Sequence, residues 1–268
     1  MSFTIYQPKT AQLTPIVVSV PHAGQNFPTT DHNLYHPDLL RRRFDTDWFV
    51  DRLYGFCETL GITLIVADYS RYVVDLNRDP QGGQLYSDGR RETSVVSDHT
   101  FEGHLVYQGF IPDQDFVKKQ IKTYYEPYHT KLHELLRNLQ AQFKHVLLWD
   151  AHSIARKVST IQDGHPFPDL ILGDQDGRTA HPKLIETALK SLRNHGFELS
   201  HNSPFKGGYI TRSCGNPQLQ VHALQLEMSQ DIYLNDDDID IDPKKLRRLQ
   251  PILKNTLKNL GDCLKDLP

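Results

Sequence analysis

Residues 16–24 of the chain read IVVSVPHAG. The run at residues 16–20 is rich in β-branched residues, and it is followed by Pro21 and His22. Such a run is typical of a buried β-strand. Residues 146–153 read VLLWDAHS, so a second apolar run is followed by an aspartate and then by His152. The carboxyl ends of parallel strands meet at one edge of a sheet. The two histidines are therefore candidates for one shared site.

Strand-like and helix-like segments alternate along the whole chain. Strands are expected at residues 16–20, 62–67, 72–76, 146–149, 170–173, 209–211 and 221–228. Helices are expected at residues 47–60 (ended by Gly61), 113–141 (interrupted near Pro127), 182–195 and 243–260 (capped by Asp242). This alternation predicts an α/β fold with a central mixed, largely parallel sheet flanked by helices. The sequence has no internal repeat and no flexible linker, so we expect one domain over residues 1–268.

Composition limits the classes of partner and the compartment. The formal net charge of −3 gives no reason to expect nucleic acid or an anionic membrane as partner. Apolar runs are too short to span a bilayer, and the first residues do not read as a secretory signal. The three cysteines are isolated, which favours the reducing cytoplasm. We expect a cytoplasmic protein that acts on a small molecule, and the oligomeric state stays open.

The 14 histidines are unusual, and any transition metal would have to be held by histidine and carboxylate. Either histidine alone is better explained as a hydrogen-bonded loop residue, but the pair His22 and His152, in matching positions after two strands, favours metal ligands. Asp150 or Ser153 could hold the second ring nitrogen of a ligand histidine. Two histidines and one carboxylate would leave one metal position open for water.

Asp45 and Asp47 stand at the start of the helix predicted at residues 47–60. One carboxylate can cap that helix, and the other is then available as the third metal ligand. Spacing alone leaves both assignments open.

Arg71 and Arg78 flank the strand predicted at residues 72–76, and Asn77 lies beside the second of them. An arginine fork pairs bidentately with a carboxylate, and the amide adds a neutral donor. The alternative is a surface turn in which the arginines pair with nearby aspartates. On spacing alone, a site for an acidic substrate and such a surface turn are equally compatible with these residues.

Glu227 lies in an apolar run, between Leu226 and Met228. Partial removal from water would raise its pKa toward values useful for a general base. The alternative is an edge-strand residue that points into solvent.

Tyr209 and Arg212 follow a Gly-Gly turn at residues 207–208. As a loop, this segment could close over a substrate. Otherwise it is the entry to a hairpin with a solvated arginine.

Five segments resemble the N-formylglutamate amidohydrolase (deformylase) family. They are residues 20–24 (VPHAG), 45–54 (DTDWFVDRLY), 70–78 (SRYVVDLNR), 150–153 (DAHS) and 204–212 (PFKGGYITR). The similar stretches run from about residue 15 to residue 228, and together they are specific, whereas HAG or DAH alone would be weak. That family is distantly similar to zinc carboxypeptidases and aspartoacylases, which share a mixed sheet between helices.

The resemblance implies a metal centre. It implies zinc, or another divalent transition metal, bound by His22, His152 and a carboxylate at Asp45 or Asp47. In carboxypeptidases the acidic ligand precedes an aromatic residue, which favours Asp47. Gln25 stands where those relatives have the glutamate of a His-x-x-Glu pair, so this sequence departs from their pattern.

The resemblance also implies an activity. The pair Asn77-Arg78 is similar to one that the wider group uses on substrate carboxylates, and Arg212 and Tyr209 would add to this site. Glu227 matches the general base, and Arg71 would stabilise the oxyanion.

The expected reaction is zinc-dependent hydrolysis of N-formyl-L-glutamate to L-glutamate and formate, a late step of histidine degradation. The alternatives are an amidohydrolase or small peptidase acting on other N-acyl acidic amino acids, or a non-catalytic metal- or carboxylate-binding protein.

Overall fold

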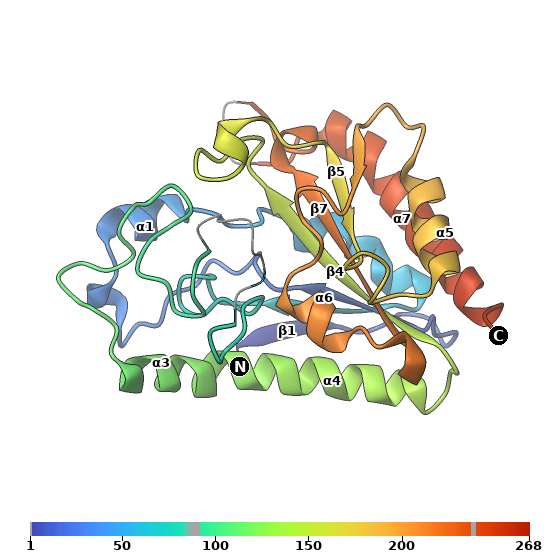
Figure 1. The fold of residues 1–268 in the computed structure, drawn as a ribbon, viewed down its shortest axis with the longest axis horizontal. Helices are drawn as coiled ribbons and strands as arrows, with labels where there is room; N and C mark the ends of the chain where they lie inside the picture. The colour runs from blue at the N-terminus through green and yellow to red at the C-terminus, as the bar shows by residue number, and fades with distance from the viewer. Residues whose placement is uncertain (1, 84, 86–91, 237–239) are drawn as a thin grey trace.

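A computed structural model of the protein describes residues 2–83, 85, 92–236 and 240–268. Its centre is a seven-stranded sheet with the strand order β1-β3-β2-β4-β7-β5-β6 (Figure 1). The strands are β1 (Phe3–Tyr6), β2 (Ile16–Val20), β3 (Thr63–Ala67), β4 (Val146–Ile154), β5 (Leu170–Gly173), β6 (Leu199–His201) and β7 (Val221–Ser229). The neighbours β3, β2, β4 and β7 pair in parallel, and so do β5 and β6, whereas β1–β3 and β5–β7 are antiparallel. The predicted α/β fold with a mixed, largely parallel sheet is confirmed.

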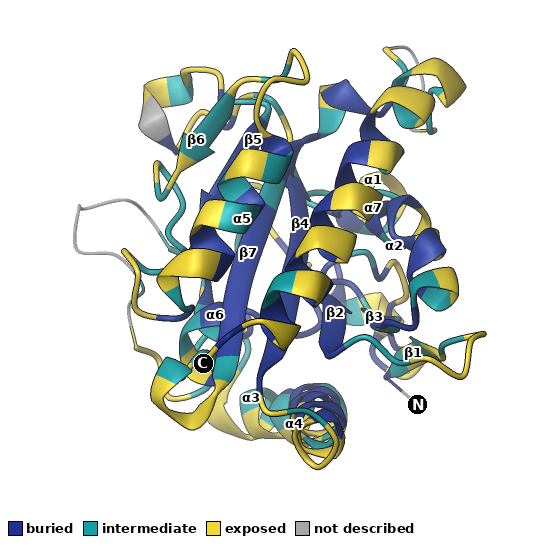
Figure 2. Ribbon diagram, turned by 90° about the vertical axis from the view of Figure 1, so that its right-hand side faces the viewer, coloured by how far each residue is buried: buried dark blue, intermediate teal, exposed yellow. Residues whose placement is uncertain are grey.

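Helices cover both faces of the sheet. On one face lie α5 (Pro182–Leu192) and α7 (Pro243–Lys265), and on the other lie α3 (Gln114–Gln120), α4 (Glu126–Gln140) and α6 (Tyr209–Cys214) (Figures 1 and 2). Two short helices, α1 (Pro37–Arg42) and α2 (Val50–Leu53), lie between β2 and β3 in the chain. None of the helices in the described ranges is long and apolar enough to cross a membrane.

Each face of the sheet carries an apolar core, because successive strand residues face opposite sides of the sheet. Val17 and Leu148 belong to the core beneath α4, whereas Val18 and Trp149 belong to the core beneath α7. The central strands are therefore buried on both faces, which explains their continuous apolar runs (Figure 2).

The prediction of one helix over residues 47–60 is wrong in its extent. The chain forms only the four-residue α2, followed by a 3₁₀ helix over Gly55–Leu60. Phe49 has a left-handed backbone, with φ of 57°, which prevents the helix from starting earlier. Gly61, with φ of 73°, ends the 3₁₀ helix as expected.

Two predicted strands are also wrong. Residues 72–76 form turns and irregular structure, in which the N–H of Asp75 donates to the carbonyl of Val95 at 2.7 Å. Residues 209–211 open the helix α6, where the side-chain oxygen of Asn77 accepts a backbone N–H at 2.8 Å. A short apolar run does not distinguish a strand from a helix when residues far away in the sequence form the hydrogen bonds of its backbone. The four-residue β1 and the three-residue β6 were not predicted.

The interruption predicted near Pro127 is confirmed, and it is a π-helical turn over Ile121–Tyr125 between α3 and α4. Proline has no N–H, and its ring clashes with the carbonyl four residues earlier, so the α-helical hydrogen-bond pattern cannot continue through it. The helix widens for one turn instead.

Candidate active site

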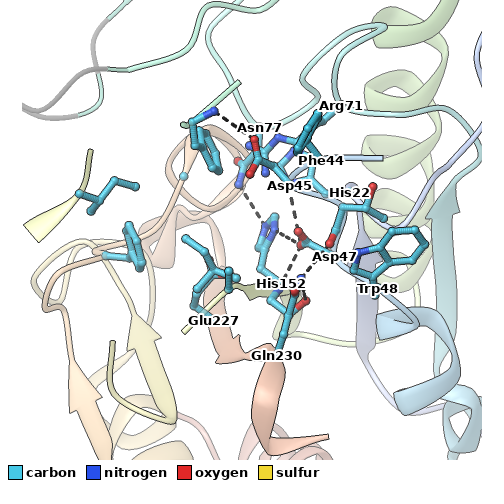
Figure 3. A pocket seen from close by; sticks show the side chains of 18 of the residues that line it. His22, Phe44, Asp45, Asp47, Trp48, Arg71, Asn77, His152, Glu227 and Gln230 are labelled. Carbon is cyan, nitrogen blue, oxygen red and sulfur yellow. Dashed lines mark hydrogen bonds and ion pairs between the residues drawn. The ribbon is translucent and has the colours of Figure 1, made fainter. Parts of the chain in front are cut away.

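A cavity of about 320 Å³ lies at the carboxyl end of β2, β4 and β7 (Figure 3). His22, Asp47, His152 and Glu227 all line it. His22 follows β2 by two residues. His152 lies within β4 rather than after it, because the strand continues to Ile154.

The pleat of the sheet brings polar side chains of two strands to one face. Asp150 and His152 alternate with apolar residues along β4, and Gln225 and Glu227 do so along β7. The register pairs Asp150 with Gln225 and His152 with Glu227. Neighbouring strands lie about 4.8 Å apart. The sheet itself therefore holds Glu227 beside His152.

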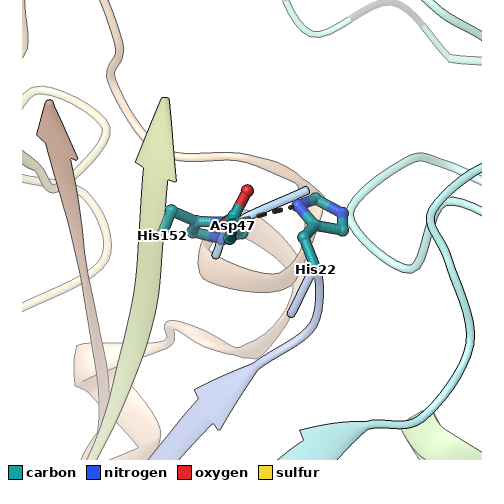
Figure 4. Close-up of side chains that lie close together, drawn as sticks. All are labelled: His22, Asp47 and His152. Carbon is teal, nitrogen blue, oxygen red and sulfur yellow. Dashed lines mark hydrogen bonds and ion pairs between the residues drawn. The ribbon is translucent and has the colours of Figure 1, made fainter. Parts of the chain in front are cut away.

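His22, Asp47 and His152 form a compact buried cluster (Figure 4). Asp47 Oδ2 lies 3.0 Å from His152 Nδ1 and 3.9 Å from His22 Nδ1. One ligand atom from each of the three residues lies within 4.8 Å of the others. The sheet brings the two histidines together, as the strand patterns predict.

This donor set fits a divalent metal. A tetrahedral zinc site has bonds of about 2.1 Å, so its ligand atoms lie roughly 3.4 Å apart, between the two measured separations. Nδ1 of His22 is buried and has no hydrogen-bond partner among the residues that the structure describes. A buried ring nitrogen without a partner is costly, and a metal ion at the cluster would give it one.

A second aspartate holds the far nitrogen of each ring. Nε2 of His22 lies 2.8 Å from Asp75 Oδ1, and Nε2 of His152 lies 3.2 Å from Asp150 Oδ2. Carboxylates in this position fix ring orientation and increase ligand basicity at metal centres. Of the two residues considered from the sequence, Asp150 makes this contact, and Asp75 makes the equivalent contact for the other ring.

The pKa values of the two rings are shifted in opposite directions. Burial, followed by the charge of Arg71, lowers the pKa of His22 below its ordinary value. Burial would also lower the pKa of His152, but Asp150 and Asp47 raise it well above its ordinary value. The carboxylates around His152 therefore favour positive charge at this ring.

Asp45 is not part of the cluster. Its carboxylate accepts hydrogen bonds from the hydroxyl of Tyr72 and from the N–H of Phe101. The backbone of Asp45 is left-handed, with φ of 54°, a conformation that non-glycine residues rarely adopt. These contacts stabilise the strained segment that carries Asp47.

Glu227 lies in an environment that suits proton transfer. Burial raises the pKa of its carboxyl group to about 8, and the nearby carboxylate of Asp47 adds to this effect, while His152 and Arg71 oppose it. Such a group exchanges a proton close to neutral pH.

Arg71, Asn77 and Arg78 also line the cavity. Arg71 Nη2 donates to Asp75 Oδ2 at 2.7 Å, and Asn77 Nδ2 lies 3.1 Å from His152 Nε2. Arg78 donates from Nε and Nη2 to Thr93, and from Nη1 to the carbonyl of Asn77. The guanidinium groups are therefore held in place by the protein.

Arg212 and Tyr209 do not line this cavity in the described part of the chain. Arg212 donates to the carbonyls of Gly207 and Leu85, at 2.8 and 2.5 Å. Tyr209 packs against aromatic rings of α4 and the π-helical turn. The structure thus leaves these two candidates outside the cavity wall.

Several cavity residues had no part in the predictions. They include Arg42, Arg43, Gln225, Gln230 and the apolar residues Phe101, Ile154, Ile161 and Phe205. Gln225 could have been found, because it lies two residues before Glu227 in the same strand and so shares its face. Ile154 ends β4 and Arg42 ends α1, and most of the others come from connecting segments whose positions depend on the tertiary fold.

The sheet and the buried two-histidine, one-carboxylate cluster define an α/β protein with a candidate metal site beside a general-base candidate. A family model described as N-formylglutamate amidohydrolase matches residues 14–234. The chain belongs to this family, as the resemblance of its motifs predicted.

Similar proteins agree with this assignment. The chain is 38% identical over 227 residues to an N-formylglutamate deformylase of Pseudomonas aeruginosa, which covers 83% of each chain. It is 35% identical over 227 residues to an N-formylglutamate deformylase of Pseudomonas putida, which covers 84% of this chain and 83% of the relative. The crystal structure of an N-formylglutamate amidohydrolase from Ralstonia eutropha is similar with a TM-score of 0.84 and 25% identity, over 99% of both chains.

Proposed function

We propose that this protein hydrolyses N-formyl-L-glutamate to formate and L-glutamate with the help of a divalent metal, zinc being the first candidate. The observation that carries the proposal is the buried cluster of His22, Asp47 and His152 beside Glu227 in one cavity. Membership of the family and the names of the two Pseudomonas relatives support the substrate.

The roles of the residues follow from their positions. A divalent metal held by His22, Asp47 and His152 would supply a Lewis acid that makes water a better nucleophile. Glu227 would accept the proton of the attacking water and return it to the departing amine nitrogen. Arg71, buried beside Asp75, would place positive charge where the formyl oxygen becomes negative.

Asn77 and Arg78 are the proposed partners of a substrate carboxylate. Both line the cavity, and protein contacts already order their side chains, so binding would cost little conformational entropy. Arg212 and Tyr209 would act indirectly, by stabilising the loop and the helix next to Asn77 and Arg78.

The proposed reaction takes place in the cytoplasm, the compartment that the unpaired cysteines favour. Its products would fit a late step of histidine degradation. We propose that the whole chain acts as one catalytic domain.

A panel of N-acyl amino acids tests this function. We expect the zinc-loaded protein to release formate from N-formyl-L-glutamate, with lower rates on N-acetyl-L-glutamate and on N-formyl-L-glutamine. Treatment with a chelator should stop formate release, and added zinc should restore it. Faster cleavage of another N-acyl acidic amino acid or a dipeptide would favour the alternative hydrolases. A protein that binds zinc but cleaves none of these compounds would be a non-catalytic binder.

Gly208 provides a test of the position of Asn77. A Cβ atom at Gly208 would lie 2.3–2.5 Å from the side-chain atoms of Asn77, so Gly208→Ala must displace that amide from His152. We expect kcat/KM for N-formylglutamate to fall about 10- to 100-fold, since small misplacements in a site have effects of this size. Gly55→Ala is the matched control, because its Cβ meets no atom within 4 Å. Full activity of Gly208→Ala would contradict the role of Asn77.

A further inference from the structure

The π-helical turn Ile121–Tyr125, between α3 and α4, contacts the segment that carries Asn77 and Arg78. Such wide turns occur mostly as single insertions in α-helices and frequently at functional sites. Gln120 and Tyr125, five residues apart, are both buried, which fits the wider step of this turn. The turn therefore changes which side chains of the helix face the sheet.

Tyr125, in this turn, and His129, one turn later, form hydrogen bonds with the backbone on both sides of Asn77. The hydroxyl of Tyr125 donates to the carbonyl of Arg78 at 2.9 Å. Nε2 of His129 lies 2.9 Å from the carbonyl of Leu76, and because a carbonyl only accepts, the ring nitrogen donates. The two rings are stacked, with centroids 4.1 Å apart and an angle of 21° between their planes. Tyr125 and His129 thus act as one pair.

This backbone needs partners from outside its own segment. Residues 72–78 form no strand, so no neighbouring strand bonds the carbonyls of Leu76 and Arg78. Leu76 is buried, and a buried carbonyl without a donor destabilises the fold. The donors come from Tyr125 and His129, which are only 5% and 8% exposed. The pair therefore fixes the segment from outside the cavity lining.

Burial lowers the pKa of His129 to about 4, although its bond to the carbonyl of Leu76 opposes this shift. The ring is therefore neutral at physiological pH, with its one proton on Nε2. The hydrogen bond to Leu76 is formed by a neutral donor that does not change between pH 6 and 8.

We propose that Tyr125 and His129 are positioning residues for the substrate carboxylate: they hold the backbone of residues 76–78 so that the Asn77 amide stays beside His152 and the Arg78 guanidinium stays at the cavity. This inference rests on the proposed function, because it assigns the support of its carboxylate-binding pair. Neither residue lines the cavity among the residues described, so both act through Asn77 and Arg78.

Tyr125→Phe tests the pair with the removal of one oxygen atom. We expect KM for N-formylglutamate to rise roughly three- to tenfold, the effect of one lost hydrogen bond. We expect kcat to stay within about twofold and zinc content to stay unchanged, because the metal cluster and Glu227 are not touched. Tyr124→Phe is the matched control, since that neighbouring tyrosine of the same turn packs against Tyr69 instead. His129→Leu should act like Tyr125→Phe, and His129→Gln, which keeps an N–H donor, should recover part of the lost affinity.

A double-mutant cycle distinguishes positioning from general stability. In an Arg78→Ala background, Tyr125→Phe should raise KM by a smaller factor than in the wild-type background, because one of the two groups that it positions is already gone. An unchanged KM in Tyr125→Phe with active wild-type protein would overturn the inference. So would an equal rise in KM in both backgrounds, or a loss of thermal stability alone. If the wild-type protein released no formate, the proposed function would fail first, and this inference would fail with it.

Discussion

Glu227→Gln is expected to lower kcat for N-formylglutamate by about 100- to 10,000-fold, the range for loss of a general acid–base group. Glutamine has the same shape, but it cannot take a proton from water or return one to the leaving nitrogen. Glu227 is outside the His22–Asp47–His152 cluster, so zinc content should stay at one ion per chain. Burial disfavours the charged carboxylate at this position, so the neutral amide should not lower the melting temperature.

The measurements are steady-state formate release, metal analysis and thermal unfolding of the same preparations. Glu186→Gln, the same change on the exposed surface of α5, is the control and should behave like the wild-type protein. If Glu227→Gln retained most of its turnover, another group would have to act as the base. If turnover and zinc were lost together, Glu227 would belong to the metal site instead.

Asp47→Asn is expected to remove most of the bound metal and, with it, the activity. Loss of an outer partner of a ligand weakens metal binding about 10- to 100-fold, and loss of a charged ligand should exceed this range. Asp45→Asn is the matched comparison, because the same change two residues away removes a carboxylate that bonds Tyr72 and Phe101. We expect Asp45→Asn to keep stoichiometric zinc.

Metal content after dialysis against a weak chelator, and the zinc affinity from competition with a chromogenic chelator, would distinguish the two variants. The opposite pattern, with metal kept in Asp47→Asn and lost in Asp45→Asn, would show that Asp45 is the ligand. Equal and full retention in both would mean that the cluster does not bind zinc through a carboxylate of this segment.

The positions of His22, His152 and Glu227 near the ends of strands could be predicted from the sequence, because local patterns of apolar residues determine those strands. The apolar runs before His22 and His152 are confirmed as β2 and β4, and parallel pairing alone brings their ends together. Glu227 follows from the same logic, since the pattern of β7 also places it near that edge. These strands are buried on both faces, so composition and structure agree strongly.

The rest of the site depends on tertiary contacts that a local pattern does not contain. Residues 72–76 look like a strand, but the carbonyl of Val95 takes the N–H of Asp75, and the segment turns. Residues 209–211 also look like a strand, but Asn77 caps the start of a helix there. The choice between Asp45 and Asp47 was open because both stand at the start of the same predicted helix. In the structure the helix α2 begins only after Phe49, whose backbone is left-handed.

The register between β4 and β7 has a consequence for changing this protein. His152 and Glu227 are paired neighbours on two parallel strands, so main-chain hydrogen bonds of the core set the separation between the His22–Asp47–His152 cluster and Glu227. The apolar wall at Phe101, Ile161 and Phe205 comes from connecting segments outside the strands. The strand residues of the cavity are therefore held rigidly, whereas the apolar residues of the connecting segments, here called the rim, can be exchanged. Redesign for bulkier acyl groups should begin at the rim and leave the two strands intact.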